Sequence, residues 1–412
     1  MQARILAASA TLIFMLSINA PSAAAAAGDL DTSFGGNGKV LTWPRRTVSA
    51  LASGVAIQAD GKIVAAGRAE GSRVGEAFAL ARYNTDGTLD ATFGGDGKVL
   101  TPGGTASAVA IQTDGKIVAA GEFSGGFALA RYKTNGTLDA TFGGDGRVRT
   151  RLAAGGASAS AVSIQSDGRI VAAGVSFALE GAGFALARYN TDGTRDATFG
   201  GDGKVRTRFR GEALADALAV QSDGRIVVAG GLFTFPGSAL ALARYNVDGT
   251  LDATFGGDGK VLNPDGGASA LAIQPNGKVV VGGSSGGAGF ALFRHRRNGS
   301  LDETFGGDGE VLTRFATGDA GLHAVSIQTD GRIVASGEVS NDTEGRFALA
   351  RYATDGILDD TFGSDGKVTT RFGGGFATAF ALAIQADGRI VAAGSREEGS
   401  GRRFALARYL AS

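Results

Sequence analysis

Residues 109–120 read Val-Ala-Ile-Gln-Thr-Asp-Gly-Lys-Ile-Val-Ala-Ala. Two short apolar runs flank an Asp-Gly pair, and such a pair supplies the positive φ angles that a tight hairpin turn requires. Neither run alternates apolar with polar residues, which indicates strands that are buried on both faces. The stretch therefore predicts a β-hairpin that is packed between neighbouring layers of protein.

The same hairpin recurs along the whole chain, together with two other motifs in a fixed order. These motifs first appear complete as Phe-Ala-Leu-Ala-Arg-Tyr at 78–83 and as Leu-Asp-Ala-Thr-Phe-Gly-Gly-Asp-Gly-Lys-Val at 89–99. A fixed period of this kind is the signature of a solenoid or a propeller. The glycine of the hairpin turn occurs seven times, at spacings of 53 to 57 residues: Gly61, Gly115, Gly168, Gly224, Gly277, Gly331 and Gly388.

Each unit is predicted to contain four strands, named a to d in chain order. Strand a is the Val-Ala-Ile-Gln type and strand b the Lys-Ile-Val-Ala-Ala type. Strand c is Phe-Ala-Leu-Ala-Arg-Tyr, and strand d ends in Gly-Lys-Val-Leu-Thr. The glycine-rich segment 94–97 is either a bulge within strand d or a loop before it, and the sequence leaves both open.

The two ends of the repeat region hold complementary fragments of one unit. Residues 28–34 contain strand-d material without a, b or c, and residues 404–409 end on strand c without d. A closed ring ties its first and last strands into one blade in this way, whereas an open stack needs polar capping repeats. Seven units also lie within the usual propeller range of about four to eight blades. We therefore predict an all-β, seven-bladed β-propeller with four antiparallel strands per blade, closed by the N-terminal strand d joining the C-terminal strands a–c.

The N-terminal residues predict a signal peptide. Arg4 supplies a positive charge, residues 5–20 are mainly apolar, and an alanine run follows up to Ala27. The apolar stretch is shorter than the ~20 residues that a membrane-spanning helix needs. We expect cleavage between Ala23 and Ala27, a leader at 1–27, a single propeller domain at 28–412, and a secreted or cell-surface protein. An uncleaved membrane anchor is the alternative.

Composition excludes several classes of function. Lysine plus arginine equals aspartate plus glutamate, 40 against 40, so the chain has no electrostatic footprint for nucleic acid or an anionic membrane. Cysteine is absent, which excludes disulfides, thiolate nucleophiles and cysteine-ligated zinc. No segment after the leader is long and apolar enough to cross a membrane. We expect no nucleic-acid partner, and we expect a monomer.

The repeated segments LDxTFGGDGKV, AIQxDGKIVAAG and FALARYNxDGT resemble the delta-60 repeat family, whose strand layout is similar to that of NHL-type propellers. The resemblance covers residues 30–409. It implies a bacterial propeller that is exported or surface-associated, and it implies no activity and no functional residues. The chain departs from the repeat at a few positions, where other residues replace phenylalanine, tyrosine, aspartate and leucine: Leu240, His295, Asn37 and Arg195, respectively.

The repeated charged residues are predicted to be structural. The strand-c arginine is expected to pair with the aspartate eight residues on, as Arg82 with Asp90, or to stack on the repeated phenylalanine; a ligand-facing arginine is the alternative. Asp86, Asp90 and Asp96 could together offer oxygens to calcium, which takes roughly 6–8 of them, but Asp-Gly is also what tight turns demand. We therefore expect no cofactor, with calcium as the alternative. His295 is expected to be a packed replacement for tyrosine.

Loop variation distinguishes the two faces of the predicted disc. The a–b turns and c–d connections are near-identical copies, whereas the b–c and d–a connections differ between units. In an antiparallel blade the two variable sets emerge on one face, and variable loops on a rigid scaffold are where recognition usually occurs. Neutral drift of exposed loops is the alternative. The candidate ligand-binding residues are the large non-repeated side chains assigned to these loops: Trp43, Arg45, Arg46, Phe233, Phe235 and His323.

The sequence thus predicts a non-enzymatic exported propeller that binds a protein or a glycan through its variable face. No catalytic, cofactor or metal residues are assigned. One alternative is a polysaccharide hydrolase or lyase that uses the same face. Another is a purely structural cell-surface protein without a small ligand.

Overall fold

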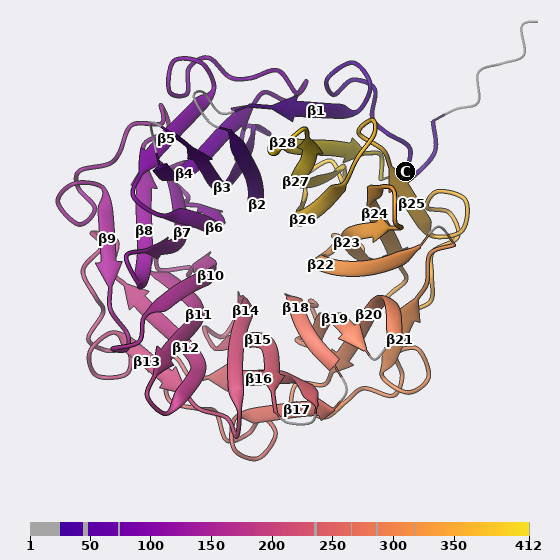
Figure 1. Ribbon diagram of the computed structural model, residues 1–412. Helices are drawn as coiled ribbons and strands as arrows, with labels where there is room; N and C mark the ends of the chain where they lie inside the picture. Colours follow the sequence, from indigo (N-terminus) through magenta and orange to yellow (C-terminus); the bar gives the residue numbers. More distant parts are fainter. Residues whose placement is uncertain are drawn as a thin grey trace, which may run out of the picture.

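The computed structural model describes residues 25–43, 48–72, 75–234, 237–264, 266–285, 287–316 and 318–411. All regular secondary structure in these ranges is β, and it forms seven four-stranded antiparallel sheets. Figure 1 shows the sheets as blades arranged in a ring around a central opening. The predicted seven-bladed propeller is confirmed.

Every blade follows the order a–b–c–d from the central opening to the rim (Figure 1). The inner strands, a, are β2 (Ser49–Ile57), β6 (Thr105–Ile111), β10 (Ala157–Ile164), β14 (Glu212–Val220), β18 (Gly266–Ile273), β22 (Asp319–Ile327) and β26 (Ala377–Ile384). Strands b are β3 (Ile63–Gly71), β7 (Ile117–Phe123), β11 (Ile170–Ala178), β15 (Ile226–Phe233), β19 (Val279–Ser285), β23 (Ile333–Ser340) and β27 (Ile390–Glu398).

The two outer strands complete each blade. Strands c are β4 (Gly75–Tyr83), β8 (Gly126–Tyr132), β12 (Gly181–Tyr189), β16 (Ser238–Tyr245), β20 (Gly287–His295), β24 (Gly345–Tyr352) and β28 (Gly401–Tyr409). Strands d are β5 (Lys98–Pro102), β9 (Arg147–Thr150), β13 (Lys204–Thr207), β17 (Lys260–Pro264), β21 (Glu310–Thr313), β25 (Lys367–Thr370) and β1 (Lys39–Thr42). Blades are numbered 1 to 7 below, from the blade of β2 to the blade of β26.

The hydrophobic core lies between blades rather than at the centre of the ring. One cluster, for example, joins Val64 and Leu80 of blade 1 to Ile117 and Tyr132 of blade 2, and all four are at most 1% exposed. Strands b and c are therefore covered on both faces, which is why their sequences are apolar without alternation. Burial of this apolar surface between neighbours is the main force that joins the blades.

A β-bulge interrupts the pairing of strands a and b in every blade. In blade 4 the register shifts between Ala215 and Ala217, so that Asp216 has no partner on β15. The glycine that ends the Ile-Val-Ala-Ala-Gly motif lies opposite the bulge. A Cβ atom added to Gly230 would overlap the carbonyl oxygen of Leu214, so only glycine fits there.

The glycine-rich segment 94–97 is a loop before strand d, not a bulge within it. Strand β5 begins only at Lys98. Gly94 and Gly97 have φ angles of 61° and 82°, which glycine adopts without strain. The same loop precedes the other outer strands and connects neighbouring blades, because the Gly94 amide donates to the carbonyl oxygen of Asn135 in the next blade.

The ring closes as predicted. Strand β1, from the N-terminal side of the chain, pairs antiparallel with β28 at the C-terminal side, with Lys39 opposite Ala407 and Thr42 opposite Phe404. Figure 1 shows the indigo strand completing the yellow blade. Seven complete blades result.

The predicted signal peptide falls mainly on residues 1–24, which lie outside the described residues. Just after them, Ala27 is 7% exposed and its carbonyl oxygen accepts a hydrogen bond from the Gly363 amide. The division at 27/28 stays a prediction, but Ala27 contacts the propeller. Among the described residues, no helix has the length and apolar character to cross a membrane.

The replacement of tyrosine by His295 is a packing change, as predicted. In the other six blades the strand-c tyrosine donates to a threonine on strand d of the preceding blade, as Tyr83 does to Thr42 at 2.8 Å. In blade 5 both partners differ: fully buried His295 lies 3.5 Å from Asn263 through its Nε2 atom, and 3.1 Å from the Gly299 carbonyl oxygen through Nδ1. Burial lowers the pKa of His295, which favours the neutral ring.

Candidate functional site

The strand-c arginines form a structural node that repeats in every blade. Arg82 Nε lies 2.9 Å from Asp90 Oδ2, and its other nitrogens donate to the Thr92 hydroxyl and the Thr134 carbonyl oxygen of the next blade. Its guanidinium carbon also lies 4.7 Å from the centre of the Phe93 ring. Both predicted roles, pairing and stacking, are confirmed. The pairs are Arg82–Asp90, Arg131–Asp139, Arg188–Asp196, Arg244–Asp252, Arg294–Asp302, Arg351–Asp359 and Arg408–Asp31.

The three aspartates considered for calcium serve three separate contacts. Asp86 accepts from the Thr88 hydroxyl at 2.6 Å, Asp90 binds Arg82, and Asp96 lies 3.2 Å from the Lys98 ammonium. Within the ranges that the structure describes, no three His, Cys, Asp or Glu side chains are grouped so that they could hold a metal ion. These carboxylates stabilise turns and the contacts between neighbouring blades.

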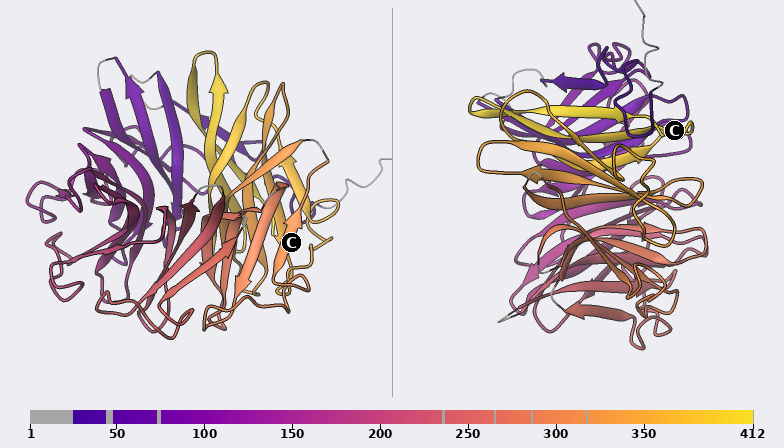
Figure 2. Two further views of the ribbon diagram at one scale, coloured as in Figure 1. Left: turned by 60° about the horizontal axis from the view of Figure 1, so that its bottom comes forward. Right: turned by 90° about the vertical axis from the view of Figure 1, so that its right-hand side faces the viewer.

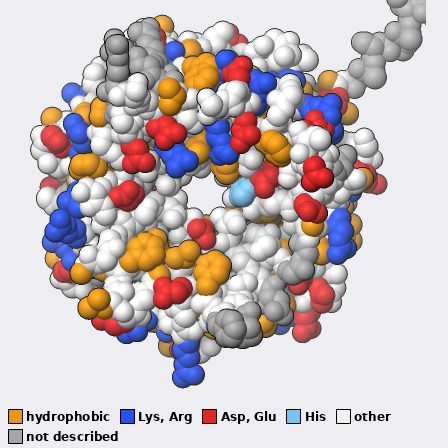
Figure 3. Space-filling model, in the orientation of Figure 1, with side chains coloured by type: hydrophobic (Ala, Val, Ile, Leu, Met, Phe, Trp, Pro, Cys, Tyr) orange, Lys and Arg blue, Asp and Glu red, His pale blue; other side chains and the backbone are white. Residues whose placement is uncertain are grey.

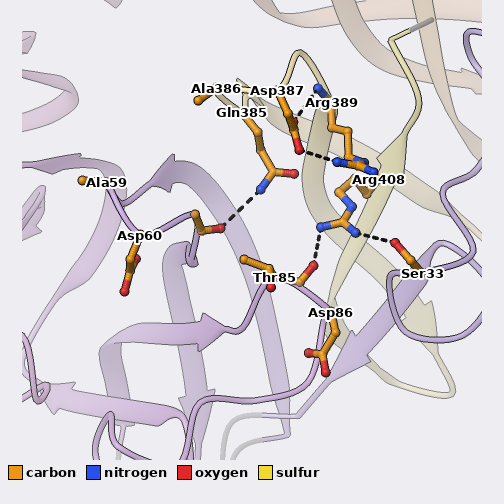
Figure 4. Close-up of a pocket in the computed structure, with 11 residues that line it drawn as sticks. Ser33, Ala59, Asp60, Thr85, Asp86, Gln385, Ala386, Asp387, Arg389 and Arg408 are labelled. Carbon is orange, nitrogen blue, oxygen red and sulfur yellow. Dashed lines mark hydrogen bonds and ion pairs between the residues drawn. The ribbon is translucent and has the colours of Figure 1, made fainter.

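A shallow pocket of about 510 Å³ lies between blades 7 and 1 on the face of the a–b turns, and Figure 4 shows it. Its polar groups bind one another. Gln385 Nε2 donates to the Gly61 carbonyl oxygen at 3.2 Å, and Arg408 donates to the Ser33 hydroxyl at 3.0 Å and to the Thr85 carbonyl oxygen. Pockets with the same kind of lining lie between other blades. We interpret these pockets as a feature of the repeated contact between neighbouring blades rather than as a unique binding site.

The opposite face, formed by the b–c and d–a connections, carries a different surface. Figure 2 shows the strands crossing the disc, so the two sets of connections lie on opposite faces. Large apolar side chains are exposed at the b–c hairpins of blades 2, 3 and 4, and we name this group the apolar arc. In Figure 3 orange side chains gather over the lower left of this face, where blades 3 and 4 lie. The arc consists of Phe123, Phe177, Leu179 and Phe233, which are 44%, 44%, 102% and 52% exposed.

Arginines brace the hairpins that carry the apolar arc. Arg149 donates to the carbonyl oxygens of Phe123 and Ser124, and its guanidinium lies 5.9 Å from the Phe123 ring centre. Arg206 donates to the Ser176 hydroxyl and the Gly181 carbonyl oxygen. Arg206 also lies 3.5 Å from the carboxylate of Glu180, whereas the printed acceptors of Arg149 are carbonyl oxygens, which carry no formal charge. The hairpins are thus held in place beside a basic surface.

The predicted site residues do not form one group. Arg45, Arg46 and Phe235 lie outside the described residues. Trp43 is half-buried, and the Arg403 guanidinium covers its ring at 4.7 Å, so one face of the indole serves the closure of the ring. Phe233 lies on the variable face, as predicted. Phe123, Phe177 and Leu179 were missed, although each is a large apolar residue in a variable b–c connection.

The assignment of His323 to a variable loop was wrong. His323 lies within the inner strand β22, where the register shifts between Leu322 and Ala324, so it is the bulge residue of blade 6. Inner strands follow the central channel, and Figure 3 shows a histidine at the wall of the opening. We name the seven bulge residues the channel ring. They are Ser53, Ser107, Ser160, Asp216, Ser269, His323 and Phe380, and all line the channel.

Two members of the channel ring carry acid–base groups. His323 Nε2 lies 2.5 Å from Glu338 Oε2, and the imidazole lies 5.2 Å from the Phe380 ring. Asp216 is exposed to the solvent of the channel. Desolvation by the channel wall nevertheless raises the pKa of Asp216 to about 6, and none of the described residues pairs with its carboxylate to offset this effect. A carboxylate left without a partner can bind a cation or exchange a proton.

These features define a repeat β-propeller with a basic, partly apolar loop face and an asymmetric channel. The family model described as "Domain of unknown function (DUF5122) beta-propeller" matches seven segments that together cover more than half of the chain, and the chain belongs to this β-propeller family. The segments are residues 58–93, 112–142, 165–199, 221–255, 274–305, 328–362 and 385–412. The finer resemblance to delta-60 repeats stays a prediction.

Comparison with solved structures shows the fold alone. A protein from Lactobacillus plantarum has a TM-score of 0.54 at 14% identity, over 83% of this chain and 98% of that one. The polysaccharide lyase Uly1 gives 0.50 at 11% identity, over 88% and 90%. Sqt1 from Chaetomium thermophilum gives 0.50 at 12% identity, over 89% and 98%. No curated protein matches the chain.

Proposed function

We propose that this chain is an exported binding module that holds a partner protein at the apolar arc. The main support for this proposal is the exposure of four large apolar side chains on the hairpins of three neighbouring blades. An exposed apolar patch on a folded protein usually marks an interaction site. The a–b/c–d face differs, because its repeated side chains are engaged in contacts between blades.

The shape and charge of the arc favour a protein over a sugar. Small ligands are usually held in concave sites that enclose most of their surface. The arc instead lies on hairpins, and Leu179 at a tip is fully exposed. Arg149, Arg208 and Arg210 on this face are exposed as well. The partner proposed is therefore a protein surface with an apolar centre and acidic side chains around it.

The carboxylates near the arc do not favour the enzymatic alternative. Glu122 accepts from the Gly125 amide and Glu212 from the Ala182 amide, both at 2.5 Å. Glu180 lies 3.5 Å from Arg206. Each of these groups thus supports a hairpin, whereas a glycosidase needs two carboxylates that face a common substrate.

The test compares two pairs of apolar-to-serine substitutions. Phe177→Ser with Leu179→Ser alters the arc, and Val247→Ser with Ile357→Ser alters exposed apolar residues on the c–d connections of the other face. Immobilised proteins are incubated with envelope extract of the producing cell, and retained proteins are identified and tested as purified pairs. We expect a purified partner whose Kd rises at least 10-fold with the arc variant, remains unchanged with the control, and rises with salt. Equal loss in both variants, or retention of glycans alone on a glycan array, contradicts the proposal.

Export rests on the leader and has its own test. Cell fractionation should place the protein outside the cytoplasm, and N-terminal sequencing should place cleavage before Ala27. This position is expected because Ala27 is buried against blade 6 and binds Gly363. A cytoplasmic protein that retains Met1 contradicts export while leaving the arc experiment intact.

A further inference from the structure

We propose that the central channel holds a binding site, at the channel ring, for a small organic molecule with a primary ammonium group and an apolar body. This site is separate from the apolar arc and uses residues of the inner strands. It rests on the position of three unlike residues in the ring, on the groups beside them, and on the channel itself.

The channel ring is where the blades differ although the surrounding wall repeats. Four of its seven members are serine, and the other three are Asp216, His323 and Phe380. The positions that follow them in the wall are glycine or alanine, and then valine or leucine, in every blade. All seven ring positions have the same bulged backbone, so side-chain chemistry is what changes. A symmetric scaffold thus presents an asymmetric set of groups toward one space.

Asp216 and its neighbours form the polar wall. Blades 3 and 5 flank blade 4, so Ser160 and Ser269 lie on either side of Asp216 in the ring (Figure 1). Within the described part of the chain, Asp216 has no hydrogen-bond or ion-pair partner. A primary ammonium has three N–H donors and a positive charge, which match one carboxylate and two hydroxyl oxygens.

Phe380 and His323 form the apolar wall. Strand β26, which carries Phe380, lies across the opening from β14, which carries Asp216 (Figure 1), and both residues line the channel. The imidazole packs at 53° against the Phe380 ring and is fixed by Glu338. Position 321 is glycine, and a Cβ atom there would lie 2.7 Å from Glu338 Oε1. The absence of a side chain at position 321 therefore leaves space for the Glu338 carboxylate that contacts His323.

Charge and size agree with this ligand class. Asp216 is the only carboxylate among the described residues that line the cavity, and the carboxylate of Glu338 lies against His323. A carboxylate in the cavity wall favours a cationic ligand. The cavity at the ring measures about 250 Å³, which is enough for a small ligand of the size of 2-phenylethylamine.

The probe is 2-phenylethylamine, titrated calorimetrically into the purified protein at pH 7.5. 2-Phenylethanol, which keeps the apolar body without the charge, and the trimethylammonium analogue, which keeps the charge without N–H donors, are the matched ligands. We expect the amine to bind at least 10-fold more tightly than either. Asp216→Asn should weaken amine binding at least 10-fold, and Phe380→Ala several-fold. Ser107→Ala, in the same ring but not beside Asp216, should leave binding unchanged.

A pH series gives an independent readout. Protonation of Asp216 removes the charge that binds the ammonium, so the Kd should rise about 10-fold between pH 7.5 and pH 5, since the pKa is near 6. Circular dichroism and thermal unfolding of Asp216→Asn control for folding. The proposal is overturned by absence of binding at millimolar amine, by equal affinity for the alcohol, by binding that survives Asp216→Asn, or by a divalent cation that binds through Asp216 in preference to the amine.

Discussion

Single residues join neighbouring blades through the arginine–aspartate node. In blade 2, Asp139 binds Arg131 Nε at 2.9 Å and the Thr141 hydroxyl at 2.8 Å, while Arg131 also binds the Thr191 carbonyl oxygen of blade 3. Both members of the pair are at most 4% exposed. A buried charge that loses its partner keeps its desolvation penalty, so each node is sensitive to the loss of either group.

The substitution Asp139→Asn tests this node. It leaves Arg131 buried without its carboxylate, and we expect the free energy of unfolding to fall by about 3 kcal/mol. Asp114→Asn is the matched control in the same blade, because Asp114 forms an exposed pair with Lys116 and should change stability by less than about 0.5 kcal/mol. Urea unfolding of the three proteins gives the comparison. Equal effects of the two substitutions contradict a structural role for the node.

The pH dependence of this effect has a defined sign. Burial acts to raise the pKa of Asp139, but hydrogen bonds from Thr141 and the charge of Arg131 outweigh it and hold the pKa below its usual value. A carboxyl with a lowered folded-state pKa stabilises the fold above its unfolded pKa of about 3.9, and this contribution is lost as pH falls through the folded pKa. The stability gap between the parent and Asp139→Asn should therefore be constant above pH 5 and shrink below about pH 4. A gap that widens on acidification contradicts this account.

Among the elements, the bulge in each inner strand determines which side chain of that strand points into the channel. Without the extra residue, strand a would keep strict alternation, and the bulge changes the direction of one side chain per blade. Its position depends on the strand-b glycine opposite, because any side chain there overlaps the strand-a backbone. Gly230 therefore supports the orientation of Asp216 although it contacts no solvent.

Gly230→Ala should be far more damaging than an ordinary glycine substitution. Its Cβ would overlap the Leu214 carbonyl oxygen, and we expect a loss on the order of 3 kcal/mol as the bulge is displaced. Gly144→Ala is the control, because Gly144 has a φ of 91° but open space around it, and should cost about 1–2 kcal/mol of backbone strain. Thermal and urea unfolding measure both. A milder effect at Gly230 than at Gly144 means that the bulge can relax without it.

The strands also show which structural features could be predicted from the sequence and which could not. Hairpins, strands and the closed ring were predictable, because Asp-Gly turns, apolar runs and complementary ends are local or repeated signals. The bulges were not, since Ala-Ser-Ala and Ala-Asp-Ala carry no marker of their own and the register depends on a glycine in the adjacent strand. His323 was therefore misplaced, and Asp216 and Phe380 were not recognised. An alignment of each strand a to the glycine that ends Ile-Val-Ala-Ala-Gly would have brought these three residues to one position.

At the scale of the whole molecule, residues 27–29 and residues 410–411 together form a turn in blade 7 that is equivalent to the c–d turns of the other blades. In blade 1 this turn contains hydrogen bonds from the Asn84 amide to the Thr88 carbonyl oxygen and from the Gly87 amide to the Asn84 carbonyl oxygen. In blade 7, Leu410 donates to the Asp29 carbonyl oxygen and Gly28 to the Leu410 carbonyl oxygen. The contacts to blade 6 are also reproduced: Arg351 donates to the Ala411 carbonyl oxygen and Gly363 to that of Ala27.

The shared hydrogen-bond pattern places Ala411 at the position of Thr85 and Ala27 at the position of Asp86. The two alanines therefore occupy adjacent positions of one turn. We therefore predict that a circular permutant with a direct peptide bond from Ala411 to Ala27, opened at the equivalent bond between Thr134 and Asn135, folds with a stability within about 1 kcal/mol of the parent. Deleting Ala411 from the permutant shortens the turn by one residue and removes the acceptor of Arg351, which should cost about 2–4 kcal/mol. Circular dichroism and urea unfolding distinguish the two. If the shortened permutant is as stable as the direct one, the turn is not built as the hydrogen bonds indicate, and closure of the ring rests on the β1–β28 pairing alone.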